Sequence, residues 1–81
     1  MNYIATFYSH FGAVRFKKQC GQQGMEAKLM PVPRDLSSSC GTCVSYEGDS
    51  YEIEGIVSEE LEQIVCRLPE GYQVMYRATD S

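Results

Sequence analysis

The apolar residues of this chain are divided into short segments, each about the length of one β-strand. Gly, Pro and Ser interrupt these segments throughout the 81 residues, so no apolar run is long enough to span a membrane. A chain of this length supports one domain with a thin core, because a small domain leaves much of its apolar surface exposed. With 43% hydrophobic and 22% charged residues, the composition is that of a globular protein. The sequence therefore predicts a single domain over residues 1–81.

The first half of the chain changes from a strand pattern to a helix pattern and back. A run of apolar and β-favouring residues predicts a buried strand over residues 3–8. Ser9 is a suitable N-cap for a helix that extends to Gln23. Gly24 is well placed to end that helix in a left-handed conformation. Alternating apolar and polar residues then predict a strand over residues 25–29.

The second half begins with a loop over residues 30–41, where two prolines and three serines exclude long regular structure. Strand patterns follow over residues 43–47 and 72–77. Residues 51–55 fit either the second arm of a hairpin or a loop. Ser58 is a suitable N-cap for a second helix, with acidic residues near its positive end and an apolar face at helical spacing, Leu61, Ile64, Val65 and Leu68.

The predicted order is strand, helix, strand, strand, helix, strand. This order is typical of the ferredoxin-like βαββαβ arrangement, in which an antiparallel sheet carries two helices on one face. We therefore expect an α+β fold. Such a fold occurs with many activities, so the function has to be argued from a site.

Charge is distributed unevenly along the chain. Residues 1–34 contain five basic residues and one acidic residue, whereas residues 35–81 contain ten acidic residues and two basic ones. The net charge of −4 and the lack of a large basic cluster argue against general nucleic-acid binding. The basic residues suit a small anion or an acidic partner surface, and a solvated helix face explains them equally.

The chain contains four cysteines, Cys20, Cys40, Cys43 and Cys66. In a secreted protein they would suggest two disulfides. The N-terminus shows no signal-peptide pattern, which favours a cytoplasmic location and a mature start at Met1. In that compartment free thiols, a redox pair or a metal site are the expected uses of cysteine.

The loop between the second and third predicted strands combines stiff and flexible backbone around a thiol. Pro31 and Pro33 restrict the entry to this loop, and Gly41 permits another group to approach the backbone of Cys40. Successive loop amides can form a small concave site for anions. A thiolate at Cys40 would be stabilised by the groups around it, Arg34, Ser38, Ser39 and Gly41. The alternative is a buried cysteine with a purely structural role.

The sequence of this loop also resembles a known family motif. Its run Pro31-Val32-Pro33-Arg34, followed by Leu36-Ser37-Ser38-Ser39-Cys40-Gly41, resembles the motif of a family of short bacterial selenium/sulfur carrier-like proteins, also classed as a domain of unknown function. The resemblance covers roughly residues 3–77 and includes Ser9, Ala13 and Gly24. It implies that Cys40 holds sulfur or selenium as a persulfide or perselenide, without a cofactor. It further implies donor and acceptor proteins as partners, and a carrier or accessory protein more than a stand-alone enzyme.

Cys40 and Cys43 also form a C-x-x-C pair, which predicts a thiol–disulfide redox switch as an alternative. A strand pattern follows the pair, so we do not expect a thioredoxin-like fold, in which the pair opens a helix. A zinc site would need two further ligands, and the sequence has no second pair and no paired-histidine motif. A third alternative is an interaction module in which the cysteines have no chemical role.

The other reactive residue types have structural interpretations. Cys20 and Cys66 fall on or beside the apolar faces of the predicted helices, as packing residues do. His10 falls in the first turn of the first helix and would act as a base toward Cys40 only within hydrogen-bond reach. An exposed histidine at a helix start is the simpler interpretation. A homodimer would cover an exposed sheet edge, using tyrosines of the predicted strands, Tyr46, Tyr51, Tyr72 and Tyr76.

Overall fold

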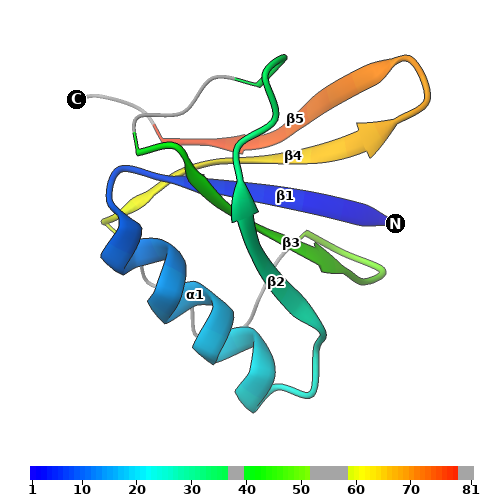
Figure 1. Cartoon of the computed structure of the whole chain (residues 1–81). Coiled ribbons are helices and arrows are strands. Elements are labelled where there is room, and N and C mark those ends of the chain that lie inside the picture. The colour runs from blue at the N-terminus through cyan, green and yellow to red at the C-terminus, as the bar shows by residue number, and fades with distance from the viewer. Residues whose placement is uncertain (37–39, 52–58, 79–81) are drawn as a thin grey trace.

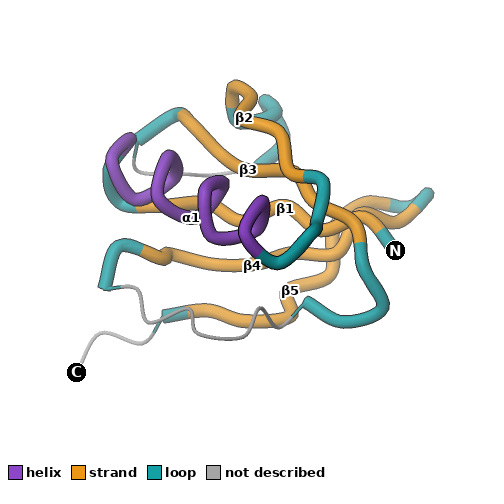
Figure 2. Tube along the Cα trace, turned by 90° about the horizontal axis from the view of Figure 1, so that it is seen from below, coloured by secondary structure: helices purple, strands orange, loops and turns teal. Residues whose placement is uncertain are grey.

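The computed structural model describes residues 1–36, 40–51 and 59–78 (Figure 1). The elements follow one another in the order β1 (Asn2–Phe7), α1 (His10–Gln22), β2 (Ala27–Pro31), β3 (Thr42–Glu47), β4 (Leu61–Leu68) and β5 (Gly71–Arg77). The strands form one antiparallel sheet in the order β2-β3-β1-β4-β5. Helix α1 lies across one face of this sheet (Figure 2) and packs against β1, β2 and β3. No helix of the described residues is long and apolar enough to cross a membrane.

Helix α1 begins and ends where the sequence predicts. The Ser9 hydroxyl oxygen accepts a hydrogen bond from the Gly12 amide at 3.2 Å, which satisfies one of the free donors of the first turn. Gly24 has a φ of +75°, in the left-handed region that favours glycine. The Met25 amide then donates to the Cys20 carbonyl at 2.9 Å. The helix is thus ended by the backbone conformation of Gly24.

The sheet carries an apolar cluster on each face. On the α1 face, the Phe16 ring lies 5.1 Å from the Phe7 ring and 5.4 Å from the Tyr46 ring. Tyr46 is therefore a buried core residue, whereas the sequence had suggested that it belongs to a pairing surface. The opposite face holds a smaller cluster, and the loop after β2 packs against it through two of its side chains, Val32 and Leu36. One face of the sheet is thus covered by α1, which connects β1 to β2. The other face is covered in part by the loop that connects β2 to β3.

The predicted second helix is wrong in its described part, because Leu61–Leu68 form the strand β4. The start of that helix at Ser58, like residues 52–55 of the predicted hairpin arm, lies outside the described residues. Strand β4 is paired on both sides and buried on both faces. A strand buried in this way has a nearly continuous apolar run, which the sequence pattern does not separate from a helix. The fold is α+β, but its described part has one helix and a fifth strand in place of the βαββαβ order.

A β-bulge explains why two apolar residues of β4 have helical spacing. Phe7 lies opposite Leu61 and Thr6 lies opposite Gln63, so one residue of β4 has no partner in β1. The extra residue brings Leu61 and Ile64 to the same face, where both join the α1-side cluster. In a regular strand, residues three apart point to opposite faces. The bulge therefore explains the spacing of Leu61 and Ile64, whereas Val65 of the same pattern belongs to the cluster on the opposite face.

The other predicted strands are confirmed with shifted ends. The predicted strand over residues 25–29 is β2, Ala27–Pro31, so Pro31 belongs to a strand and not to the loop. This proline is tolerated because β2 is an edge strand, paired with β3 alone among the described residues. Pro31 lies opposite Thr42, the first residue of β3. The paired part of the sheet therefore extends to within two residues of Cys40.

Two glycines of α1 provide a matched test of this packing. A Cβ at Gly12 would lie 2.5 Å from Glu60 Cβ, whereas a Cβ at Gly21 would meet nothing within 4 Å. We expect Gly12→Ala to lower the free energy of unfolding by about 1–3 kcal/mol through overcrowding. Gly21→Ala should raise it by about 0.5–1 kcal/mol, because alanine favours the helix. Urea unfolding checks both values, and equal effects of the two substitutions would contradict the packing of α1 against Glu60.

Candidate functional site

Cys40 lies at the end of the sheet where α1 begins. Strand β1 leads into α1 at this end, and the antiparallel strand β3 starts there (Figure 1). The Val32 amide donates to the Gly41 carbonyl at 3.0 Å, which closes the base of the loop between β2 and β3. Gly41 has a φ of +76°, and nothing lies within 4 Å of a Cβ placed there. Gly41 is thus needed for its backbone conformation, and Cys40 is held next to the paired base of the loop.

The half-buried Cys40 takes part in a short chain of contacts that ends on α1. Its thiol donates to the Thr42 carbonyl at 3.3 Å. The Thr42 hydroxyl lies 3.3 Å from Nδ1 of His10, in the first turn of α1. Cys40 also packs against the apolar cluster on the α1 face. We refer to Cys40, Thr42 and His10 as the thiol site.

The start of α1 contributes a partial positive charge to the potential at this end of the sheet. A helix N-terminus has such a charge because its first amides are unpaired, and it favours nearby anions. One carboxylate already shares this potential, since the Ser9 hydroxyl donates to Glu60 Oε2 at 2.7 Å. The Tyr8 amide also donates to the Glu60 carbonyl at 2.8 Å, which holds Glu60 at the start of α1. The thiol site therefore lies beside the helix start, whose cap residue Ser9 bonds to Glu60.

Cys43 has a different environment from Cys40. It belongs to the buried cluster on the face opposite α1, and its thiol donates to the Pro31 carbonyl at 3.7 Å. Burial raises the pKa of the Cys43 thiol from 9.0 to about 11, and the neighbouring charge of Cys40 adds to this effect. Because the thiolate is the reactive form, Cys43 is a poor nucleophile at neutral pH. The two cysteines of the C-x-x-C pair thus pack on opposite faces of the sheet.

The remaining cysteines are core residues. Cys20 and Cys66 are both fully buried, and burial raises the pKa of the Cys20 thiol to about 11. All four cysteines lie in the described part of the chain, and Cys40 alone among them has solvent exposure. The described residues contain no group of three His, Cys, Asp or Glu that could hold a metal ion.

The other predicted site residues are distributed around the loop. Arg34 is exposed in a turn closed by the Leu36 amide, which donates to the Pro33 carbonyl at 3.0 Å. Arg34 makes no hydrogen bond or ion pair with another described residue. Asp35 of the same turn accepts a hydrogen bond from the Tyr72 hydroxyl at 3.1 Å, which fixes the turn to β5. Partial desolvation and this carboxylate raise the pKa of Tyr72. Ser38 and Ser39 lie outside the described residues.

The sequence does not identify the contact between His10 and Thr42. The interpretation of His10 as an exposed residue of the helix start is confirmed, and its ring also meets Thr42. The contact depends on β3 lying directly beside β1. A sequence pattern does not give strand order, so the available signal was only a histidine after the N-cap and a threonine two residues after a cysteine.

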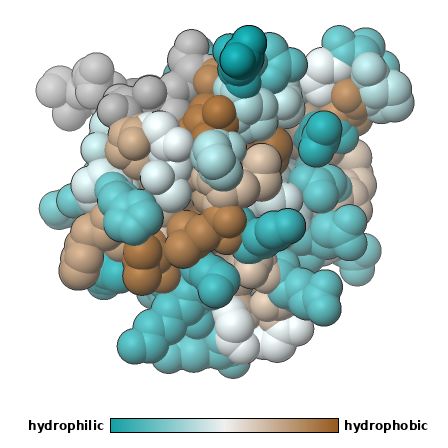
Figure 3. Space-filling view, viewed as in Figure 1, coloured by the Kyte–Doolittle hydropathy of each residue, from teal (hydrophilic) through white to brown (hydrophobic). Residues whose placement is uncertain are grey.

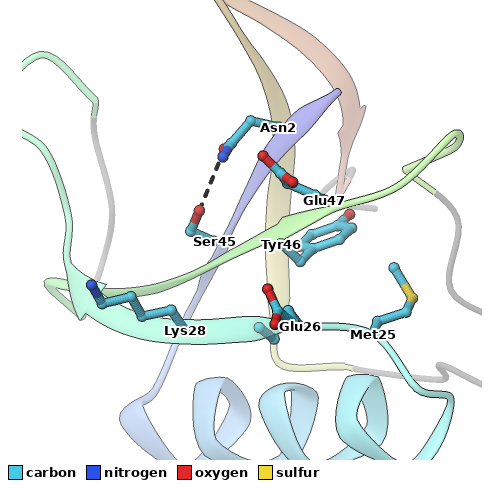
Figure 4. Close-up of a pocket in the computed structure, with 8 residues that line it drawn as sticks. Asn2, Met25, Glu26, Lys28, Ser45, Tyr46 and Glu47 are labelled. Carbon is cyan, nitrogen blue, oxygen red and sulfur yellow. Dashed lines mark hydrogen bonds between the residues drawn. The ribbon is translucent and has the colours of Figure 1, made fainter.

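A depression of about 550 Å³ lies at the other end of β3, away from the thiol site (Figure 4). It is lined by residues from the start of β2 and the end of β3, and the Ser45 hydroxyl donates to Asn2 Oδ1 at 3.3 Å across it. Two carboxylates, of Glu26 and Glu47, lie beside it. It contains no thiol, so we treat it as a separate feature.

Comparison with known proteins relates the chain to a family and to a protein of similar sequence. The family described as "Putative Se/S carrier protein-like" matches residues 2–67, which include the thiol site. The chain is also similar to "Uncharacterized protein YtiA" of Escherichia coli (strain K12), with 27% identity over 66 residues, covering 80% of this chain and 78% of that protein. No solved structure matches the chain.

The buried thiols predict a pH dependence of stability. In the folded protein the pKa of Cys20 and of Cys43 is raised from 9.0 to about 11, so both keep their protons at pH values where the unfolded chain ionises. Stability from these groups is complete below pH 9 and is lost as pH rises toward 11. The urea midpoint should fall over this range. A Cys20→Ala, Cys43→Ala double variant should show a shallower fall, and an unchanged slope would contradict the burial of these thiols.

Proposed function

The chain belongs to the Se/S carrier-like family, and from this premise we propose that it carries sulfur or selenium on Cys40 between a donor protein and an acceptor protein. In this proposal Cys40 is the carrier residue, and it holds the transferred atom as a persulfide or perselenide. Thr42 and His10 position its thiol, and Arg34, Ser38, Ser39 and Gly41 are its proposed binding residues. The protein acts as a carrier more than as a stand-alone enzyme, in the cytoplasm and without a cofactor.

The distribution of exposure among the four thiols carries this proposal. Cys20, Cys43 and Cys66 are each fully buried, whereas Cys40 is partly exposed at a sheet end that also has the start of α1. A carrier thiol has to meet a donor and then an acceptor, so it needs access from outside. Cys40 meets this requirement, and the other three thiols do not.

The transfer itself needs no external oxidant or reductant. The Cys40 thiolate attacks the outer sulfur of a donor persulfide, the new S–S bond forms at Cys40, and the bond between the two donor sulfurs breaks. The donor leaves as a thiolate, and the thiol proton of Cys40 passes to solvent or base. The acceptor thiolate then attacks the outer sulfur of the Cys40 persulfide, and Cys40 leaves as a thiolate. A perselenide donor reacts by the same sequence of bonds.

The contacts around Cys40 hold its thiol in a defined position. The bond to the Thr42 carbonyl orients the thiol, and the contact of Thr42 with His10 fixes that segment to the helix. In this arrangement His10 is a positioning residue.

Intact-mass analysis after incubation with a persulfide donor tests the proposal. We expect the native protein to gain one sulfur, because its single exposed thiol accepts it. Cys40→Ser should gain none, and Cys43→Ala should gain one as the native protein does. Circular dichroism of each variant checks that it is folded.

Two outcomes would contradict the carrier. A loss of two protons that requires both Cys40 and Cys43 would identify a thiol–disulfide switch. Absence of both adduct and disulfide with persulfide and perselenide donors would leave an interaction module. The burial of Cys43 on the opposite face argues against the first of these outcomes.

A further inference from the structure

A groove runs between α1 and the edge strand β2. Its volume is about 540 Å³, and its apolar floor is formed by residues of both elements, Val14, Met25, Ala27 and Leu29. The side chain of Val14 is 41% exposed, and that of Phe11, one turn earlier on α1, is 65% exposed. Figure 3 shows this apolar surface over α1 and the part of the sheet beside it. Val14 and Phe11 therefore present apolar surface to solvent and do not belong to the buried core.

Basic residues border the groove. Lys17 and Lys18 line it, whereas Lys28 of β2 lines the depression that contains Glu26 and Glu47. Residues 1–34 have a formal charge of +4, from five basic residues and one acidic residue, whereas the remainder of the chain has −8, from two and ten. Lys17 and Lys18 make the rim positive on a protein whose net charge is −4. Its charge complements an acidic segment of a partner.

The two elements that form the groove both continue to the thiol site. Strand β2 ends at Pro31, opposite Thr42, and α1 starts at His10, whose ring contacts the same threonine. At its other end the groove reaches Met25, which also lines the depression that contains Glu26 and Glu47 (Figure 4). Those carboxylates repel an acidic ligand, so its negative groups would lie along the α1 side. The free edge of β2, which has no strand partner among the described residues, suits an extended segment.

We propose that this groove binds an extended segment of the exchange partner, in which acidic and apolar side chains alternate. The apolar side chains lie on Val14 and Leu29, and the carboxylates face Lys17 and Lys18. Bound in this way, the segment holds the rest of the partner near Cys40. The identity of the partner rests on the proposed function, whereas binding of the segment does not require sulfur transfer.

Amide chemical-shift titration with synthetic peptides tests the groove. The probes are two peptides of equal length, one alternating Leu with Glu and the other alternating Leu with Lys. We expect the acidic peptide to bind saturably to the Cys40→Ser protein, with shifts at residues 14–18 and 27–29. Binding should weaken as salt is added, because the contacts on the rim are exposed. A Lys17→Glu, Lys18→Glu variant should bind about tenfold or more weakly.

Arg67→Glu is the matched control, since this exposed basic residue lies on β4, away from the groove. It should bind the acidic peptide as the native protein does. Equal binding of the two peptides, shifts centred outside the groove, or no saturable binding would overturn the proposal. Sedimentation that showed a dimer formed through Val14 would assign the groove to a second copy and also overturn it.

The result is independent of the proposed function. Cys40→Ser cannot carry sulfur on residue 40, so peptide binding to this variant reports on the groove alone. Sulfur loading of the native protein without peptide binding would refute the groove and leave the carrier. Peptide binding without loading would refute the carrier and leave the groove.

Discussion

Strand β1 is the constraint on which the other elements depend. It is paired with β3 on one side and β4 on the other, and residues 3–7 are at most 2% exposed. Its alternating side chains supply both apolar clusters, with Tyr3, Ala5 and Phe7 on the α1 face and Ile4 on the other. Because β1 and β3 are antiparallel, the end of one and the start of the other meet at the same sheet end. That pairing places the start of α1 next to Cys40.

The same arrangement gives the thiols of Cys40 and Cys43 different degrees of burial. In a strand, neighbouring side chains point to opposite faces, so a cysteine within β3 is either in the α1-side core or in the opposite cluster. Cys43 is in the opposite cluster, where burial raises its pKa, while Cys40 precedes the strand and packs only partly against the core. The position of a cysteine relative to the start of β3 thus determines whether it is accessible. The C-x-x-C spacing alone would have suggested two equivalent thiols.

Sequence patterns predicted the local structure where one interaction dominates. The cap at Ser9, the left-handed Gly24 and the strand β5 follow from neighbouring residues, and the structure has all three. Strand β4 was predicted as a helix because its bulge, which depends on pairing with β1, gives helical spacing to buried residues. The contact between His10 and Thr42 depends on strand order and could not be predicted for the same reason. Cys40 was singled out from the sequence, but the contacts of its thiol required the fold.

A carrier cysteine has to pass on the atom that it receives. To measure this step, the native protein is loaded with an isotopically labelled outer sulfur, the donor is removed, glutathione is added, and both products are followed by mass spectrometry. We expect labelled glutathione persulfide and a protein returned to its unmodified mass. Labelled sulfide released together with a Cys40–Cys43 disulfide would contradict this expectation, because the sulfur would then have left through internal oxidation of the protein and not by transfer.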